Sequence, residues 1–117
     1  MTDTNNTPWE SQIANELANA KKALSEKNDG RARACARRAV GVIVKEYWAQ
    51  KKTTGSAPAQ SAVDRLNDVS RNEQFPEDIR KAAQRLTTNV KYRLSSDFTL
   101  HPVHDAELII TYFKNLL

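Results

Sequence analysis

The stretch RARACARRAVGVIVKEYWAQKK, residues 31–52, decides the fold of this chain. Small and apolar side chains recur in it every three or four residues, as they do along one face of an α-helix. This seam consists of Ala32, Ala36, Ala39, Ile43 and Tyr47, and it is widened by Cys35, Val40 and Val44. An apolar arc this broad predicts a helix that its neighbours contact on more than one side. We therefore expect residues 31–52 to form the central helix of the protein.

Small residues within this stretch favour close packing. The alanines of its N-terminal half allow a neighbouring backbone to approach closely. Gly41 lies in the middle of the helix, where glycine costs about 1 kcal/mol relative to alanine. Close packing against another element is one reason to keep a glycine at this position.

A first helix precedes the central one. Thr7 is a capping residue, Pro8 suits the first helical position, and Glu10 completes a capping box. The apolar stripe that follows consists of Trp9, Ile13, Leu17, Ala20 and Leu24. The sequence NDG at residues 28–30 is a typical helix stop, and we expect Asp29 to cap the central helix. Because the turn is short, the first two helices should pack antiparallel.

Three further helices are predicted after a flexible surface loop at residues 53–60, and they cover residues 61–71, 77–95 and 102–117. The first carries Val63, Leu66 and Val69; the second Ile79, Ala83, Leu86, Val90 and Leu94; the third Val103, Ala106, Ile110, Phe113 and Leu117. The predicted fold class is therefore all-α, an up-and-down bundle of four long helices plus one short helix. We expect a disordered N-terminus over residues 1–7 and a single helical-bundle domain over 8–117.

Composition agrees with one globular domain. The chain has 117 residues, of which 39% are hydrophobic and 27% charged, so disorder of the whole chain is not expected. Its only cysteine, Cys35, has no internal partner for a disulfide, which suits a reducing cytosol. We find no signal peptide and no apolar run near the ~20 residues that a membrane span needs. The prediction is a soluble, cytoplasmic protein with no membrane partner.

Positive charge is concentrated in the central helix, where seven basic residues stand against Glu46 alone. Such a track can bind phosphates, and Tyr47 and Trp48 near its end offer rings for base stacking. The candidate nucleic-acid-binding residues are Arg33, Arg37, Arg38, Lys45, Lys51 and Lys52. The alternative is that these long side chains cover the edges of a buried helix and pair with carboxylates of its neighbours. The sequence leaves both interpretations open.

The densest group of chemically active side chains is RLSSDFTLHPVHD, residues 93–105. It contains three candidate catalytic residues, Arg93, His101 and His104. Arginine stabilises the negative charge of a phosphorane, and histidine transfers protons near neutral pH. Together they suffice for metal-free cleavage of RNA through attack by the neighbouring 2′-hydroxyl. Alternatively, Arg93 is a solvated cation at a helix end and His101 is a polar residue before a proline.

No metal or cofactor is expected. Two histidines and one cysteine are too few for a structural zinc site, and Cys35 lies far in sequence from both histidines. Because Cys35 sits among alanines on a helix, we expect it in the core rather than in a catalytic pair with a histidine.

Taken together, these patterns resemble a HEPN-type domain, the small helical bundle of prokaryotic toxin–antitoxin and defence systems. The resemblance runs from about Trp9 to Leu117. It rests on the central helix GRARACARRAVGVIV at residues 30–44, on Arg93 preceding His101, and on the closing helix HPVHDAELIITYF at residues 101–113. It implies a dimer, in whose catalytic members an arginine and a histidine meet at the interface to cut RNA without metal. Other members lack this motif and act as binding or antitoxin-like partners.

The spacing in this chain departs from that of the catalytic members. Seven residues separate Arg93 from His101, and ten separate Arg93 from His104. The function we predict is therefore a non-catalytic, dimeric binding module for a protein or nucleic-acid partner, such as RNA or a nucleotidyltransferase. The alternative is a metal-independent endoribonuclease that uses the arginine–histidine pair at a dimer cleft.

Overall fold

The computed structural model describes residues 8–51, 61–92, 94 and 98–117. This part of the chain is helical and contains no strand, which confirms the all-α fold class. The elements are α1 (Pro8–Ser25), α2 (Asp29–Lys51), α3 (Ala62–Arg71), α4 (Glu77–Thr87), the short 3-10 helix η1 (Val90–Tyr92) and α5 (Pro102–Leu116). The expectations for residues 1–7 and for the loop at 53–60 fall outside the described residues.

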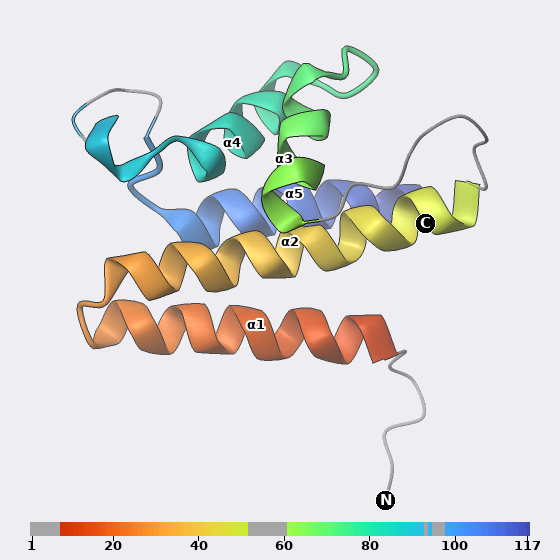
Figure 1. The fold of residues 1–117 in the computed structure, drawn as a ribbon. Coiled ribbons are helices and arrows are strands. Elements are labelled where there is room, and N and C mark those ends of the chain that lie inside the picture. Colours follow the sequence, from red (N-terminus) through yellow and green to blue (C-terminus); the bar gives the residue numbers. More distant parts are fainter. Residues whose placement is uncertain (1–7, 52–60, 93, 95–97) are drawn as a thin grey trace, which may run out of the picture.

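Helix α2 is central, as its broad apolar arc predicts. It contacts α1, α3, α4 and α5. Figure 1 shows α1 along one side of α2, with α3 and α4 on the other. Every residue of the predicted seam is buried, and so are the three residues that widen it. The periodicity of residues 31–52 therefore correctly identifies the element that the other helices cover.

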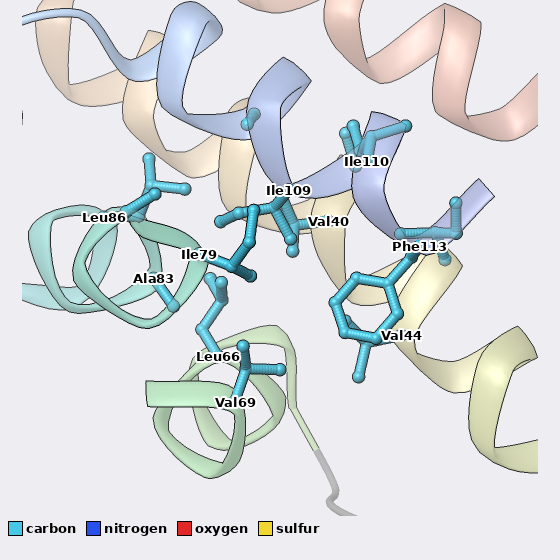
Figure 2. Close-up of a cluster of buried hydrophobic side chains, with 14 of the residues drawn as sticks. Val40, Val44, Leu66, Val69, Ile79, Ala83, Leu86, Ile109, Ile110 and Phe113 are labelled. Carbon is cyan, nitrogen blue, oxygen red and sulfur yellow. The ribbon is translucent and has the colours of Figure 1, made fainter. Parts of the chain in front are cut away.

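The main core lies where α2 meets α3, α4 and α5. Figure 2 shows apolar side chains from these four helices pointing toward one another. They include Val40, Val44, Leu66, Val69, Ile79, Ala83, Leu86, Ile109, Ile110 and Phe113, each 4% exposed or less. Burial on this scale is the dominant favourable contribution to folding, at roughly 25 cal/mol per Å² of apolar surface.

Small residues let the helices around α2 come close. Ala20 and Ala23 of α1 are buried, as are Ala32, Ala36 and Ala39 of α2. On another side of α2, a Cβ atom added at Gly41 would lie 2.9 Å from Cβ and 3.1 Å from Cα of Ala62. The start of α3 therefore rests directly against the α2 backbone, which confirms that Gly41 serves close packing.

The turn between α1 and α2 differs from the prediction in its capping residue. The side-chain Oδ1 of Asn28, rather than that of Asp29, accepts the bond from the Arg31 amide at 3.2 Å. The Asn28 amide in turn donates to the Ala23 carbonyl oxygen at 2.8 Å, and Lys27 adopts a φ of 60°. This is the Schellman arrangement, in which one residue in the left-handed region closes the helix. Asp29 instead occupies the first turn of α2.

Helix α4 is shorter than predicted. It ends at Thr87 rather than near residue 95, so the described part of the chain has three long α-helices, two short ones and the 3-10 helix η1. The hydroxyl groups of Thr87 and Thr88 both donate to the Gln84 carbonyl oxygen, at 3.1 and 2.8 Å. Such side-chain bonds compete with continuation of a helix. Leu94, assigned to the apolar stripe of this helix, is 96% exposed.

Three other residues of the predicted stripes lie at the surface. Leu24, Val63 and Leu117 are 37%, 39% and 40% exposed. At α1 the buried position is taken by Ala23 instead, so the end of the α1 stripe faces α2 with a smaller side chain. Ser61 caps α3, because its Oγ accepts the bond from the Asp64 amide at 3.1 Å.

Candidate functional site

An open groove of about 470 Å³ lies between the start of α4 and the outer face of α5. The α5 residues that line it recur every three or four positions, so they form one face of that helix. This face is distinct from the one buried in the core. The lining residues are Pro76, Asp78, Ile79, His104, Glu107, Leu108, Thr111, Tyr112 and Asn115.

The groove has an apolar floor and a polar rim. Ile79 is buried, while Leu108 and Tyr112 are half-buried and pack against the core from outside. Asp78 and Glu107 bring negative charge to the rim from α4 and α5 respectively. Among the described residues that line the groove there is no lysine or arginine. In a chain with a net charge of +4, this surface is locally acidic.

Tyr112 connects the groove to the aromatic core. Its ring packs edge-on against Phe75, with centroids 6.1 Å apart, and against Phe113 at 5.4 Å. Burial raises the pKa of the Tyr112 phenol, and the charges of Tyr47 and Asp78 raise it further. The phenol is therefore held in its neutral form, which can both donate and accept a hydrogen bond at the groove.

A cluster of three polar side chains, the polar clasp, joins α4 to α5 and consists of Arg85, Thr99 and Asp105. Arg85 donates to Asp105 twice, from Nη2 to Oδ1 at 2.7 Å and from Nε to Oδ2 at 3.1 Å. The Thr99 hydroxyl donates to the same Oδ2 at 2.7 Å, and its amide to the Arg85 carbonyl oxygen at 3.3 Å. The hydrogen bond to Asp105 raises the pKa of Arg85, although burial acts against it. A bidentate arginine–carboxylate pair of this kind is strong and directional.

The polar clasp fixes the relative position of the two groove walls. Arg85 lies at the end of α4 and Asp105 in the first turn of α5, whereas Ile79 at the start of α4 shares the groove with Tyr112 further along α5. The two helices therefore run antiparallel. The clasp joins the end of α4 to α5, whereas the groove lies at the start of α4 and runs along the outer face of α5 from His104 to Asn115.

Neither the clasp nor the groove was predicted from the sequence, although one signal for the clasp was present. Asp105, Ile109 and Phe113 are spaced four residues apart and all three are buried. A carboxylate in such an apolar stripe requires a buried cation or several donors. The identity of its partner, Arg85, depends on tertiary structure.

The three candidate catalytic residues do not lie together in one described site. Arg93 lies outside the described residues. His101 is the N-cap residue of α5, exposed, and its side chain makes no capping hydrogen bond. His104 is exposed one turn later and lines the groove together with Asp78 and Tyr112. Within the described residues, the groove around His104 contains no arginine.

Three arginines of the basic helix bind other parts of their own chain. The Arg33 guanidinium lies 5.0 Å from the centroid of the Phe98 ring. Arg37 is half-buried and its Nη1 donates to the Leu86 carbonyl oxygen at 3.3 Å. Burial lowers the pKa of Arg37, and so do the nearby charges of Arg33 and Arg38. Arg38 pairs with Glu16 of α1 at 3.1 Å. These contacts favour the interpretation in which long side chains cover the edges of a buried helix.

The remaining basic candidates are more exposed. Lys45 and Lys51 lie at the surface, with the Lys51 ammonium 5.4 Å from the Tyr47 ring centroid, and Lys52 falls outside the described residues. Tyr47 itself is 4% exposed, and Gln74 donates to its hydroxyl at 3.2 Å. The expectation that Tyr47 is available for base stacking is therefore wrong. Its ring belongs to the aromatic core, and Trp48 packs edge-on against it at 4.9 Å.

Cys35 lies in the core, as its alanine-rich surroundings predict. It is fully buried in a cluster with Ala20 and Val103, and its sulfur accepts a bond from Arg38 Nη2 at 3.2 Å. Over the described residues, no three histidine, cysteine, aspartate or glutamate side chains gather into a group suited to a metal ion. Among the helices of this same part of the chain, none has the length and apolar character to cross a membrane.

Comparisons of the chain with protein-family models, with curated proteins and with solved structures give no match. The HEPN resemblance therefore stays a prediction. What the fold and the site define is an all-helical protein with an open, acidic groove on its last helix.

Proposed function

We propose that this chain is a HEPN-like, up-and-down helical bundle that acts as a dimeric, non-catalytic binding module in the cytoplasm, and that it binds a protein partner. The observation that carries the proposal is the groove between α4 and α5. Its floor is apolar, its rim supplies hydrogen-bonding groups, and its walls are held by the polar clasp. A preformed groove of this kind suits helical segments of other proteins.

A protein partner is favoured over a nucleic acid by the charge of the two surfaces. The groove carries Asp78 and Glu107, which repel phosphates. On the basic helix, Arg37 and Arg38 already have partners in the same chain. Releasing them to bind a phosphate would break these contacts. Because the arginines serve the fold, the basic helix is the weaker candidate for a binding surface.

The second candidate function is the metal-independent endoribonuclease. It is favoured by the exposure of His101 and His104 at the start of α5, where both imidazoles are accessible to a substrate. In this mechanism Arg93 supplies the positive charge and a histidine the proton transfer. The dimer places the groups of two protomers together.

Incubation with single-stranded RNA in excess chelator separates the two functions. We expect the RNA to stay intact. Cleavage that is abolished by His101→Ala or His104→Ala would overturn the binding module in favour of the nuclease. Light scattering coupled to size-exclusion chromatography tests the dimer, which should have twice the chain mass of 13.2 kDa.

Groove binding itself can be tested with a displayed library of helical peptides. We expect selected peptides to bind the wild-type protein and to lose binding to Leu108→Asp, which places a charge on the groove floor. Lys45→Ala is the matched control, since Lys45 is exposed on α2 and does not line the groove. Peptides that select normally but bind both variants equally would show that the recognition surface lies elsewhere.

A further inference from the structure

The acidic rim of the groove is available to an incoming ligand. Asp78 accepts a bond from the adjacent Ile79 amide through Oδ1 at 3.0 Å, and it forms no ion pair with the described residues. Glu107 pairs with Lys21 at 3.5 Å, but both side chains are about half exposed. Exposed pairs of this type contribute little and exchange readily. Negative charge is therefore present on both walls without a strong internal partner.

The floor between these carboxylates selects for apolar side chains on one face of a ligand. Ile79 and Leu108 provide aliphatic surface, and the ring of Tyr112 extends it along α5. Thr111 and Asn115 follow on the same helix and offer hydrogen-bonding groups. An apolar strip flanked by charge is complementary to an amphipathic segment whose own flanks carry the opposite charge.

The secondary structure of the ligand follows from the groove walls. Addition of an extended peptide requires an exposed sheet edge, and the described part of the chain has no strand. Recognition of a proline-rich peptide requires a groove lined by several aromatic rings, whereas Tyr112 is the one tyrosine, phenylalanine or tryptophan among the described residues that line this groove. Two helical walls instead suit a third helix, which satisfies its own backbone hydrogen bonds.

We propose that the α4–α5 groove binds a basic amphipathic helix of a partner protein. The inference rests on the proposed function and deepens it, because it specifies the chemistry of the partner. Apolar side chains at three- and four-residue spacing enter between Ile79 and Leu108. Lysines or arginines on the two flanks of the partner helix pair with Asp78 and Glu107. The polar clasp keeps the walls at a constant separation, so the ligand is ordered on binding and the groove is not.

Fluorescence anisotropy with two labelled peptides tests this inference. Both peptides contain about 15 residues, enough for a marginally stable helix, with leucines on one face. One carries lysines on its polar face and the other carries glutamates. We expect the lysine peptide to bind the protein at least about tenfold more tightly at low salt, and this advantage to shrink as salt screens the charges.

Two double variants test whether the rim carboxylates cause the tighter binding of the lysine peptide. Asp78→Asn with Glu107→Gln removes the rim charges and should weaken binding of the lysine peptide about tenfold. The matched control is Asp68→Asn with Glu26→Gln, which removes the same charge from exposed positions that do not line the groove. It should leave the affinity within about twofold. Thermal unfolding of each variant verifies that the fold is intact.

The outcomes separate the inference from the proposed function. Equal binding of the two peptides, lost in Leu108→Asp, would overturn the preference for a basic helix and keep the groove as a docking site. Equal loss of affinity in the rim and control variants would also overturn the inference, because only overall charge would then matter. Binding that Leu108→Asp leaves unchanged would overturn the groove itself, and with it the proposed function.

Discussion

The two faces of α5 differ in what covers them. On the inner face, Ile109 and Phe113 are fully buried against α2 and its neighbours. On the outer face, Leu108 and the ring of Tyr112 also provide apolar surface but remain half exposed along the groove. One helix therefore carries two apolar stripes, of which the fold covers one. The covered stripe contributes to the stability of the chain, and the open stripe leaves apolar surface for a partner.

Because the fold covers only one of the two faces, truncation of similar side chains on them should have different consequences. A residue truncated on the inner face leaves a cavity that the packed core fills only partly. A residue truncated on the outer face leaves space that water already reaches. We expect inner substitutions to change the free energy of unfolding and outer ones to change binding.

Phe113→Ala should have the largest effect. Its ring is fully buried and packs edge-on against Tyr47 at 5.0 Å and Phe75 at 5.1 Å. Removal of such a ring costs about 3–5 kcal/mol. Denaturant unfolding measures it, with Leu108→Ala as the matched change on the outer face, expected below about 1 kcal/mol. Equal losses from the two substitutions would contradict the distinction between the faces.

Arg85→Met ranks next, because it breaks the clasp that holds the two groove walls. The substitution keeps most of the side-chain volume but leaves the Asp105 carboxylate, which is 4% exposed, without its cation. Breaking a buried pair from one side costs about 3–5 kcal/mol, and we expect the lower value because Thr99 still donates to Asp105.

Denaturant unfolding measures the stability of Arg85→Met, and Lys81→Met is the matched control. Lys81 also forms an ion pair on α4, with Glu77 at 3.2 Å, but both side chains are mostly exposed. Its loss should cost less than about 0.5 kcal/mol. If both variants were equally stable, packing alone would hold α4 against α5.

Much of the inner face could be predicted because it follows from periodicity. The seam of α2 repeats at helical spacing, and a broad arc of that kind has to be covered from several sides. The end of α4 is harder to predict, because Val90 and Leu94 continue its apolar stripe in the sequence. The two threonines at residues 87 and 88 end the helix through side-chain bonds, which a hydrophobic pattern does not represent.

The groove and the clasp could not be predicted from the sequence, for a different reason. The pattern of α5 shows both apolar stripes, but which stripe is covered depends on where α4 lies. The Arg85–Asp105 pair joins residues 20 positions apart across a loop. The basic residues of α2, and Arg93 with His101 and His104, each form a group whose members lie close together in the sequence. The clasp residues are brought together only by folding.

Gly41→Ala tests how closely α2 and α3 pack, because it adds a single methyl group between them. The new Cβ would lie 2.9 Å from the Ala62 Cβ, so α3 would have to move away from α2. Overpacking of a core costs about 1–3 kcal/mol, against which alanine gains about 1 kcal/mol in helix propensity. We expect a net loss of about 1 kcal/mol in unfolding experiments, partly restored by adding Ala62→Gly.

The matching change in the groove is Asn115→Gln, which adds one methylene where the surface is open. It should alter stability by less than about 0.5 kcal/mol. A stabilised Gly41→Ala protein would show that the α2–α3 contact can relax without loss.

The smallest effect, the titration of Tyr112, reports directly on the open face. Its raised pKa means that the folded protein holds the phenol proton more tightly than the unfolded chain, whose tyrosines titrate near 10. The associated stability is present below that value and is lost as the pH rises through the pKa of the folded state.

Subtracting the phenolate absorbance of Tyr112→Phe from that of the wild-type protein isolates this one titration among the three tyrosines. Its midpoint should lie above the unfolded value and move down in Asp78→Asn, because Asp78 contributes to the shift. A midpoint that Asp78→Asn leaves unchanged would show that burial of the phenol alone, without the charge of Asp78, raises its pKa.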